Sequence, residues 1–184
     1  EANKYQLFFV GPNEDVKVKT AEQLFEIYLS SVGRGSTLLL NIPPDQRGLF
    51  HEKDIESLKG YKKLLETEFA FNIAKKARVK TSSIRSNEAI YAGKMITDGK
   101  KDTYWTTDND LSTGSFEIDL GKTATVKYIV LQEYIRLGQR VKAFTVDIWK
   151  DGTWQKVAGA TTIGYKRILK IDPVNTSKIR VNIN

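Results

Sequence analysis

The sequence predicts an α+β protein of two units: a βαβα unit over residues 1–70, followed by an antiparallel β-sandwich over residues 71–184. The first part combines unbroken apolar runs with helix-type periodicity, whereas the second shows the two-residue alternation of half-buried strands. The charge balance changes at the same place. Residues 1–70 carry 9 Lys/Arg against 11 Asp/Glu, and residues 71–184 carry 20 against 11.

Two apolar runs in the first unit are predicted to be buried strands. The run "KYQLFFV" stops at the turn sequence "GPNED", and "STLLLNIPPD" stops at Pro43 and Pro44. Because these runs do not alternate, we expect both of their faces to be buried, as in a parallel sheet covered by helices. Two strands alone would leave sheet edges and a face uncovered, so the unit is predicted to be the tail of a larger (β/α)8-type barrel.

A helix is predicted after each of these strands. The first begins after Thr20, an N-cap with Gln23 in the capping-box position, and ends near Gly33. Its inner face is predicted to contain Leu24, Ile27, Tyr28 and Ser31 or Val32. The second begins at about Glu52, with an inner stripe of Ile55, Leu58, Tyr61 and Leu65.

Polar residues follow both predicted strands. In a βα barrel the chemistry lies at the carboxyl ends of the strands, which predicts Glu14, Asp15, Asn41 and Asp45 near a pocket rim. The alternative is that these residues only form turns. His51 is the only histidine and is predicted to cap a helix, and a chain with one His and no Cys is a poor candidate for a zinc site or a Ser-His-Asp triad.

In the second unit, six segments are predicted to be strands because apolar residues alternate along them or turn signals bound them. They are "RVKT", "SFEIDL", "VKYIVL", "AFTVDIW", "RILKI" and "KIRVNI". The turn signals between them are "STG", "LGKTA", "KDGTW" and "IDPVN". Strands without intervening helices predict an antiparallel sandwich.

The loop "MITDGKKDTYWTTDND" leaves three interpretations open: a metal loop, a sugar platform, or a corner of the sandwich. Its oxygens predict a hard-cation site at Asp98, Asp102 and Thr103, although the spacing is not that of an EF-hand. The alternative is that the two aspartates cap turn amides. Tyr104 and Trp105 are candidates for stacking on sugar, and the alternative for Trp105 is a core plug.

Aromatic rings and guanidinium groups are the usual tools for holding glycans. The predicted sugar-binding set is therefore Tyr104, Trp105, Arg136, Arg140 and Trp154. The basic half leaves two alternatives, an anionic partner such as a sulfated glycan or nucleic acid, or an ordinary solvated surface. Since no five like charges are consecutive, we expect no nucleic-acid partner. No apolar run is long enough to predict a membrane span, and no signal peptide is apparent.

The second unit resembles the discoidin-like, coagulation-factor type C β-sandwich, a jelly roll that includes carbohydrate-binding modules of family 32. The matching segments are "ITDGKKDTYW", "SFEIDLGKTATVKYIVLQE", "RVKAFTVDIWKDGTWQKVA" and "IGYKRILKI". In that family the "DG…T.W" loop often holds a structural calcium. The resemblance therefore implies calcium at Asp98, Asp102 and Thr103.

The first unit resembles the end of the catalytic barrel of α-L-fucosidases of glycoside hydrolase family 29, through "GRGSTLLLNIPPDQRG" and the residues around it. This resemblance implies part of an exo-acting, retaining enzyme that acts on fucosylated glycans. The family's nucleophile and acid/base precede this region, so this chain alone is predicted to be inactive and to need the rest of the barrel as a partner. The alternative is a non-catalytic module that binds carbohydrate or braces the barrel. Enzymes of this kind are usually exported, which implies a periplasmic or extracellular location.

Overall fold

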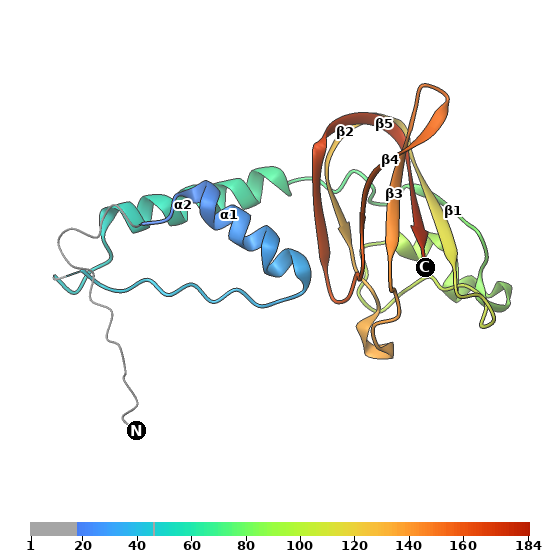
Figure 1. Ribbon diagram of the computed structural model, residues 1–184, viewed down its shortest axis with the longest axis horizontal. Helices are drawn as coiled ribbons and strands as arrows, with labels where there is room; N and C mark the ends of the chain where they lie inside the picture. The colour runs from blue at the N-terminus through green and yellow to red at the C-terminus, as the bar shows by residue number, and fades with distance from the viewer. Residues whose placement is uncertain (1–17, 46) are drawn as a thin grey trace. The chain divides into compact units, whose positions relative to one another are not determined.

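The computed structural model describes residues 18–45 and 47–184, which form two compact units (Figure 1). The first extends to Ser31 and continues over Thr37–Phe71, and the second comprises Val32–Ser36 and Asn72–Asn184. The second unit thus includes a short segment that precedes residue 70. The predicted strand "KYQLFFV" lies outside the described residues. No helix in the described part of the chain is long and apolar enough to cross a membrane.

Helix α1 (Ala21–Ser30) begins with the predicted capping box. The Thr20 hydroxyl accepts a hydrogen bond from the Gln23 backbone N–H at 3.3 Å, and the Gln23 side chain accepts one from the Thr20 N–H at 2.9 Å. The predicted inner face is only partly right. Leu24 is buried, but Phe25 and Leu29 complete the buried face, whereas Ile27 and Tyr28 are half-buried.

Two glycines, Gly33 and Gly35, follow the end of α1, whereas the sequence predicted a helix end at Gly33 alone. Helix α1 already ends at Ser30, and Gly33 lies buried in the 3₁₀ helix η2 (Val32–Arg34). A Cβ on Gly33 would lie 3.2 Å from the Cβ of Ile168 within the second unit, so this close approach favours glycine. Gly35 then turns the chain with φ of 85°.

The predicted strand Leu38–Ile42 is wrong for the described residues. The segment is irregular, and the Leu39 side chain is 91% exposed. A strand needs a neighbouring strand to accept and donate its backbone hydrogen bonds. The strands of the described residues all belong to one sheet in the second unit, and Leu38–Ile42 pairs with none of them. Among the described residues, this apolar segment therefore has no strand with which to form backbone hydrogen bonds.

Helix α2 (Glu52–Glu68) begins at its predicted position, and His51 caps it by accepting a hydrogen bond from the Lys53 N–H on Nδ1 at 3.2 Å. The predicted stripe is weaker than expected, since Ile55 is 37% exposed and no α2 residue is fully buried. Gly60 lets α1 and α2 approach closely, because a Cβ there would lie 2.8 Å from that of Ala21.

The second unit is a five-stranded antiparallel sheet in the order β1-β2-β5-β3-β4. Its strands are β1 (Arg78–Thr81), β2 (Gly114–Leu131), β3 (Phe144–Lys150), β4 (Thr153–Ala160) and β5 (Arg167–Ile183). The six predicted segments all fall on these strands, except that "AFTVDIW" begins one residue before β3, and four of them fuse pairwise into β2 and β5. Strand β4 was not predicted. It is joined to β3 by the predicted turn, where Asp151 and Gly152 have φ of 50° and 78°.

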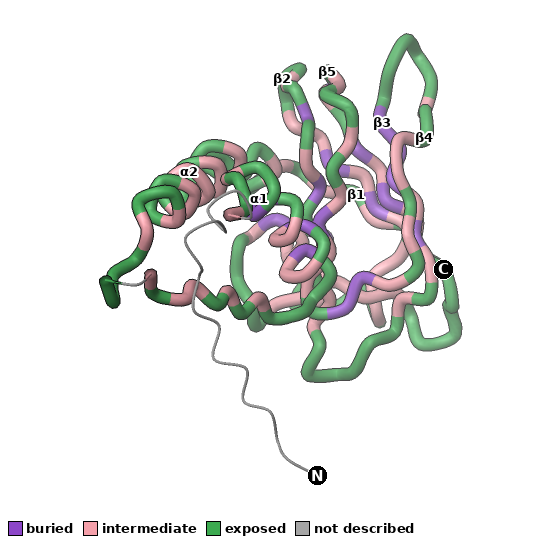
Figure 2. Tube along the Cα trace, turned by 60° about the vertical axis from the view of Figure 1, so that its left-hand side comes forward, coloured by how far each residue is buried: buried purple, intermediate pink, exposed green. Residues whose placement is uncertain are grey.

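One core collects residues from both halves of the long strands. Phe116 and Ile118 come from the first half of β2, and Val126 and Ile129 come from its second half, beyond a register irregularity between Asp119 and Ala124. Figure 2 shows buried residues gathered along the strands of this unit. The remaining core members are Phe144, Val146, Ile163, Ile179 and Val181. Two halves of one strand lining a shared core are consistent with the predicted sandwich.

The opposite face of the sheet carries a row of alternating charges. The register pairs Lys80 with Glu117, Glu117 with Arg180, Arg180 with Asp147, and Asp147 with Lys156. Arg180 and Asp147 form an ion pair at 2.9 Å, and both side chains are largely buried. Because opposite charges face each other across each strand pair, a slip by one residue would place charges on the core side. This row therefore specifies the register of the sheet.

We expect Phe144→Ala to lower the free energy of unfolding of the chain by about 3–5 kcal/mol, because Phe144 is 2% exposed and its loss leaves a cavity. The change is measured by urea denaturation followed by tryptophan fluorescence. Val130→Ala is the matched control, since Val130 is 47% exposed and should cost less than about 1 kcal/mol. Equal losses in the two variants would show that the core does not centre on Phe144.

Candidate functional site

The structure brings together only two of the five predicted sugar-binding residues, Tyr104 and Arg136. Tyr104 stacks on Tyr134 with a centroid distance of 4.7 Å and an interplanar angle of 19°, and Tyr91 lies 5.4 Å away on a tilt. The Arg136 guanidinium lies 5.9 Å from the Tyr134 ring, and Arg85 lies 5.7 Å from Tyr91. Burial, with help from the hydrogen bond to Tyr91, raises the pKa of the Tyr104 hydroxyl.

This tyrosine stack joins three separate loops. Its rings pack on one another, so the face of Tyr104 that would stack on a sugar already contacts Tyr134. A glycan platform needs an aromatic face that is free to receive the sugar ring. The stack therefore ties the three loops together, and sugar binding by Tyr104 and Arg136 stays a prediction.

Trp105 has the alternative role that the sequence left open, a plug in the core. Its ring meets Phe116 edge-on at 5.6 Å, and its indole N–H donates to the Ser83 carbonyl at 2.8 Å. Gly114 makes room for it, since a Cβ there would lie 3.1 Å from the Trp105 ring.

In the described residues, the hydroxyl oxygen of Ser83 and Nε of Arg85 are buried without a hydrogen-bond partner.

Trp154 lies on β4, at the edge of the charged face. The Arg180 guanidinium covers its ring at 4.4 Å, and Trp149 meets it edge-on at 5.2 Å. Arg180 is held in place by Asp147, whose carboxylate also accepts from the Asn182 amide at 2.9 Å. This network braces strands β3, β4 and β5 through a cation–π contact and charge-assisted hydrogen bonds.

Arg140 belongs to a loop that is organised by Glu133, a residue the sequence analysis did not select. One carboxylate oxygen of Glu133 accepts from the backbone N–H groups of Arg140 at 2.8 Å and Val141 at 3.0 Å. The other oxygen accepts from the N–H of Gly164, a buried residue with φ of 64°. Glu133 thus anchors two loops at once. The available signal was an acidic residue two positions after the end of an apolar strand.

The three predicted metal ligands do not converge as a carboxylate cage. Asp98 accepts on one oxygen from the Lys100 N–H at 2.8 Å and on the other from the Thr103 hydroxyl at 2.7 Å. These hydrogen bonds hold the pKa of Asp98 below its ordinary value against the opposing effect of desolvation. Asp102 instead pairs with Arg136 at 3.2 Å.

Among the described residues, no three His, Cys, Asp or Glu side chains gather closely enough to hold a metal ion. Calcium takes six to eight oxygen ligands, which include backbone carbonyls and waters as well as carboxylates. Asp98 and Thr103 place two oxygens side by side, whereas Asp102 is paired elsewhere, and calcium at these three residues stays a prediction. The loop is a sandwich corner that Asp98 closes.

Asp98 and Thr103 also line a pocket of about 420 Å³ that the sequence analysis did not predict. Its remaining lining residues are Lys76, Ala77, Lys94, Met95, Thr97 and Lys100. The lining contains three lysines and one carboxylate, and all three lysines are exposed. The lysines come from separate parts of the sequence, so only the general surplus of basic residues after residue 71 signalled it.

In the first unit, Asp45 closes a turn and Asn41 is exposed. One Asp45 carboxylate oxygen accepts from the Arg47 and Leu49 N–H groups at 2.8 and 3.2 Å, and the other accepts from the Arg47 guanidinium. Arg47 also reaches Glu52 at 2.8 Å. Hydrogen bonds from Arg47 hold the pKa values of both Asp45 and Glu52 below their ordinary values. Glu14 and Asp15 lie outside the described residues.

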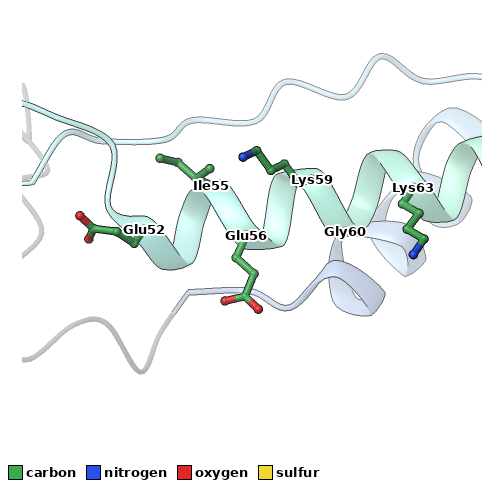
Figure 3. A pocket seen from close by; sticks show the side chains of 6 residues that line it. All are labelled: Glu52, Ile55, Glu56, Lys59, Gly60 and Lys63. Atoms are coloured by element: carbon green, nitrogen blue, oxygen red, sulfur yellow. The ribbon is translucent and has the colours of Figure 1, made fainter.

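A hollow of about 520 Å³ runs along α2 (Figure 3). Its lining consists of Glu52, Ile55, Glu56, Lys59, Gly60 and Lys63, all from one helix. Since a single helix supplies every lining residue, no second element among residues 18–45 and 47–184 presents a group across the hollow. It is an open helix surface rather than a formed active site.

Residues 95–181 match the family model of the NedA-like, galactose-binding domain, which confirms the discoidin-like resemblance. α-L-Fucosidase 1 of Arabidopsis thaliana is 34% identical over 155 residues, which cover 83% of this chain and 31% of that protein. The homologues of this chain are α-L-fucosidases of glycoside hydrolase family 29. The chain spans about a third of the length of the curated relatives it matches.

Solved structures of α-L-fucosidase relatives share the fold of both parts. SpGH29 is 42% identical with a TM-score of 0.84, covering 90% of this chain and 36% of that chain. A Ruminococcus gnavus GH29 fucosidase, solved in complex with fucose, is 30% identical with a TM-score of 0.83, covering 90% of this chain and 34% of its own. The similarity thus extends well beyond the sandwich.

We expect Glu133→Gln to destabilise the chain by about 1–3 kcal/mol, because an amide replaces one of two acceptor oxygens and faces a buried backbone donor. Urea denaturation measures the loss, and amide hydrogen exchange at Gly164 should become faster. Glu88→Gln is the control, because Glu88 is exposed and should change stability by less than about 0.5 kcal/mol. Unchanged exchange at Gly164 would contradict the anchoring role.

The Asp45 carboxyl should titrate below its ordinary pKa, and Arg47→Gln should raise that pKa. Because folding lowers the pKa, this group contributes stability above the ordinary value of about 3.9, and the contribution is lost as the pH falls through the lowered value. The ¹³C shift of the side-chain carboxyl measures both midpoints. Identical midpoints in the two proteins would show that Arg47 does not stabilise the carboxylate.

Proposed function

We propose that this chain is the C-terminal portion of an exo-acting, retaining α-L-fucosidase that hydrolyses terminal α-L-fucosyl residues of glycans. The observation that carries the proposal is the match to Arabidopsis α-L-fucosidase 1 over 83% of this chain. The similarity to a family 29 enzyme solved in complex with fucose supports fucose as the sugar that is released. We propose that a fucosylated glycan binds as substrate to the complete enzyme, of which this chain is one part.

The catalytic carboxylates are proposed to lie outside the described residues. A retaining glycosidase needs a nucleophile and an acid/base carboxyl about 5–5.5 Å apart, and the acid needs a raised pKa. Asp45 and Glu52 have lowered pKa values and are both paired with Arg47. They suit a rigid turn better than proton transfer. We therefore propose that the chain alone does not turn over substrate, and Glu14, Asp15 and Asn41 remain predicted neighbours of the pocket rim.

The first unit is proposed to be the end of the (β/α)8-type barrel. Its exposed apolar residues are those that a barrel would cover: Leu39, Leu49, Phe50, Ile55 and Phe71. In a barrel, Leu38–Ile42 would gain neighbouring strands on both sides, and its continuous apolar sequence would be buried on both faces. The hollow along α2 would receive a neighbouring element (Figure 3).

The sandwich is proposed to brace the barrel. Each predicted aromatic sugar contact is packed against the chain itself: Tyr104 on Tyr134, Trp105 on Phe116 and Trp154 under Arg180. These contacts favour bracing over sugar stacking. Export to the periplasm or the extracellular space stays a prediction.

The proposal predicts that this chain leaves 4-nitrophenyl α-L-fucopyranoside intact, whereas a chain extended N-terminally by the relatives' missing region hydrolyses it with retention of configuration. Colorimetric assay measures the rate, and ¹H NMR measures the anomer first released. Hydrolysis by this chain alone, or none by a folded extended chain, would refute the proposal.

A variant of Leu39 sharpens this test. Leu39→Asp should leave the stability of this chain nearly unchanged, because the side chain is 91% exposed, but should cost the extended enzyme more than about 3 kcal/mol and most of its activity. Leu111→Asp, at a 49% exposed position of the sandwich, is the matched control and should be tolerated in both.

A further inference from the structure

The connection between α1 and Leu38–Ile42 belongs to the sandwich rather than to the helices. Its residues, Val32–Ser36, group with Asn72–Asn184 in the second unit and are referred to as the docked segment. The chain on either side, up to Ser31 and over Thr37–Phe71, groups with the first unit. The sandwich therefore includes a short segment that is separated in the sequence from all of its other residues.

Two glycines bring the docked segment against the start of β5. Gly33 is buried, and a Cβ added there would lie 3.2 Å from Cβ and 3.5 Å from Cγ1 of Ile168. A Cβ on Gly35 would lie 3.6 Å from the carbonyl oxygen of Lys166. Ile168 is itself only 8% exposed. The backbone of the docked segment therefore packs directly on a buried side chain of the sheet.

The surface that receives the docked segment is held by hydrogen bonds to the loop after β2. The Gln132 amide donates to the Tyr165 carbonyl at 3.1 Å, and the Glu133 N–H donates to the Gly164 carbonyl at 2.9 Å. The Glu133 carboxylate also accepts from the Gly164 N–H. Strand β5 then pairs with β2 from Arg167 onward. The receiving surface is thus fixed by the sandwich itself.

In the proposed barrel, the docked segment is the loop that joins a helix to the next strand. Loops of this kind lie at the amino-terminal ends of the barrel strands, whereas the chemistry lies at the carboxyl ends. Asn41 and Asp45, the predicted neighbours of the pocket rim, follow the apolar run Leu38–Leu40 and so belong to the opposite end of that strand. The contact with β5 is therefore on the side of the barrel away from the substrate.

We propose that the sandwich holds the barrel at its amino-terminal face by fixing the docked segment, and that this contact serves stability rather than substrate binding. Leu38 follows Ser36 by two residues, so even an extended chain places the start of the strand within about 7 Å of the docked segment. Docking on β5 therefore limits where this strand can begin. The barrel as the element that is held rests on the proposed function, whereas the docking on β5 does not.

The alternative is that the two glycines serve only the turn. Gly35 has φ of 85° and needs glycine for that reason alone, but Gly33 is not among the residues with positive φ. In a free turn, Gly33→Ala should therefore strengthen the local structure, because alanine loses less conformational freedom on folding than glycine. If the segment is docked on Ile168, the same change should weaken it, because the added Cβ overpacks the contact. The sign of the effect distinguishes the two interpretations.

The first experiment measures amide hydrogen exchange of Gly35 in this chain, since its N–H donates to the Val32 carbonyl at 3.1 Å. Gly33→Ala should make this exchange roughly tenfold faster. Arg34→Ala, at an exposed position of the same 3₁₀ helix, is the control and should change it less than about twofold. In an Ile168→Ala background, which removes Cγ1 and Cδ1, Gly33→Ala should have a smaller effect. Unchanged or slower exchange in Gly33→Ala would overturn the docking.

The second experiment uses the N-terminally extended chain. Gly33→Val should lower its midpoint of thermal unfolding by several degrees, and well below that midpoint KM for 4-nitrophenyl α-L-fucopyranoside should change less than about twofold. Arg34→Val is the control and should leave the midpoint within about 1 °C. A changed KM with an unchanged midpoint would overturn the proposal, because the segment would then serve the pocket. A folded but inactive extended chain would refute only the proposed function, since exchange and unfolding need no hydrolysis.

Discussion

The antiparallel pairing of β2 with β5 is the constraint on which the second unit depends, because it puts both ends of two long strands against one core. Phe116 pairs with Val181 at one end, and Ile129 pairs with Leu169 at the other. The alternating charges on the opposite face leave this pairing a single favourable register. Once the register is set, the loops at the strand ends have fixed anchors.

Those anchors explain why so many polar and aromatic side chains of this unit contact the chain itself. Glu133 leaves the end of β2 and gathers the amides of Arg140, Val141 and Gly164. The tyrosine stack then ties its neighbour Tyr134 to Tyr104. Buried amides of loops need acceptors, and a carboxylate serves two loops with one side chain. These contacts hold the loops to one another, and one face each of Tyr104 and Tyr134 is used in the stack.

Local patterns were sufficient to predict elements whose cause is local. The capping box at Thr20, the start of α2 and the alternation in β3 all depend on neighbouring residues, and all are confirmed. Leu38–Ile42 was predicted wrongly because an apolar run specifies burial but supplies no pairing partner. Strand β4 was missed because, as an edge strand, it has half-exposed residues in no clean alternation. The partners of Glu133 could not be predicted, because they depend on which loops the sheet brings together.

The exposed apolar residues of the first unit are the reason for proposing a further part of the barrel as its neighbour. Leu39, Phe71 and Phe50 are 91%, 88% and 55% exposed. Water is a poor solvent for such groups, and another part of a polypeptide covers them without an added ligand. The sandwich also exposes apolar and aromatic residues, such as Ile90 at 60% and Tyr165 at 54%, but its own strands supply a buried core. Because no residue of α2 is fully buried, the proposed neighbour matters more for the packing of the helices than for that of the sandwich.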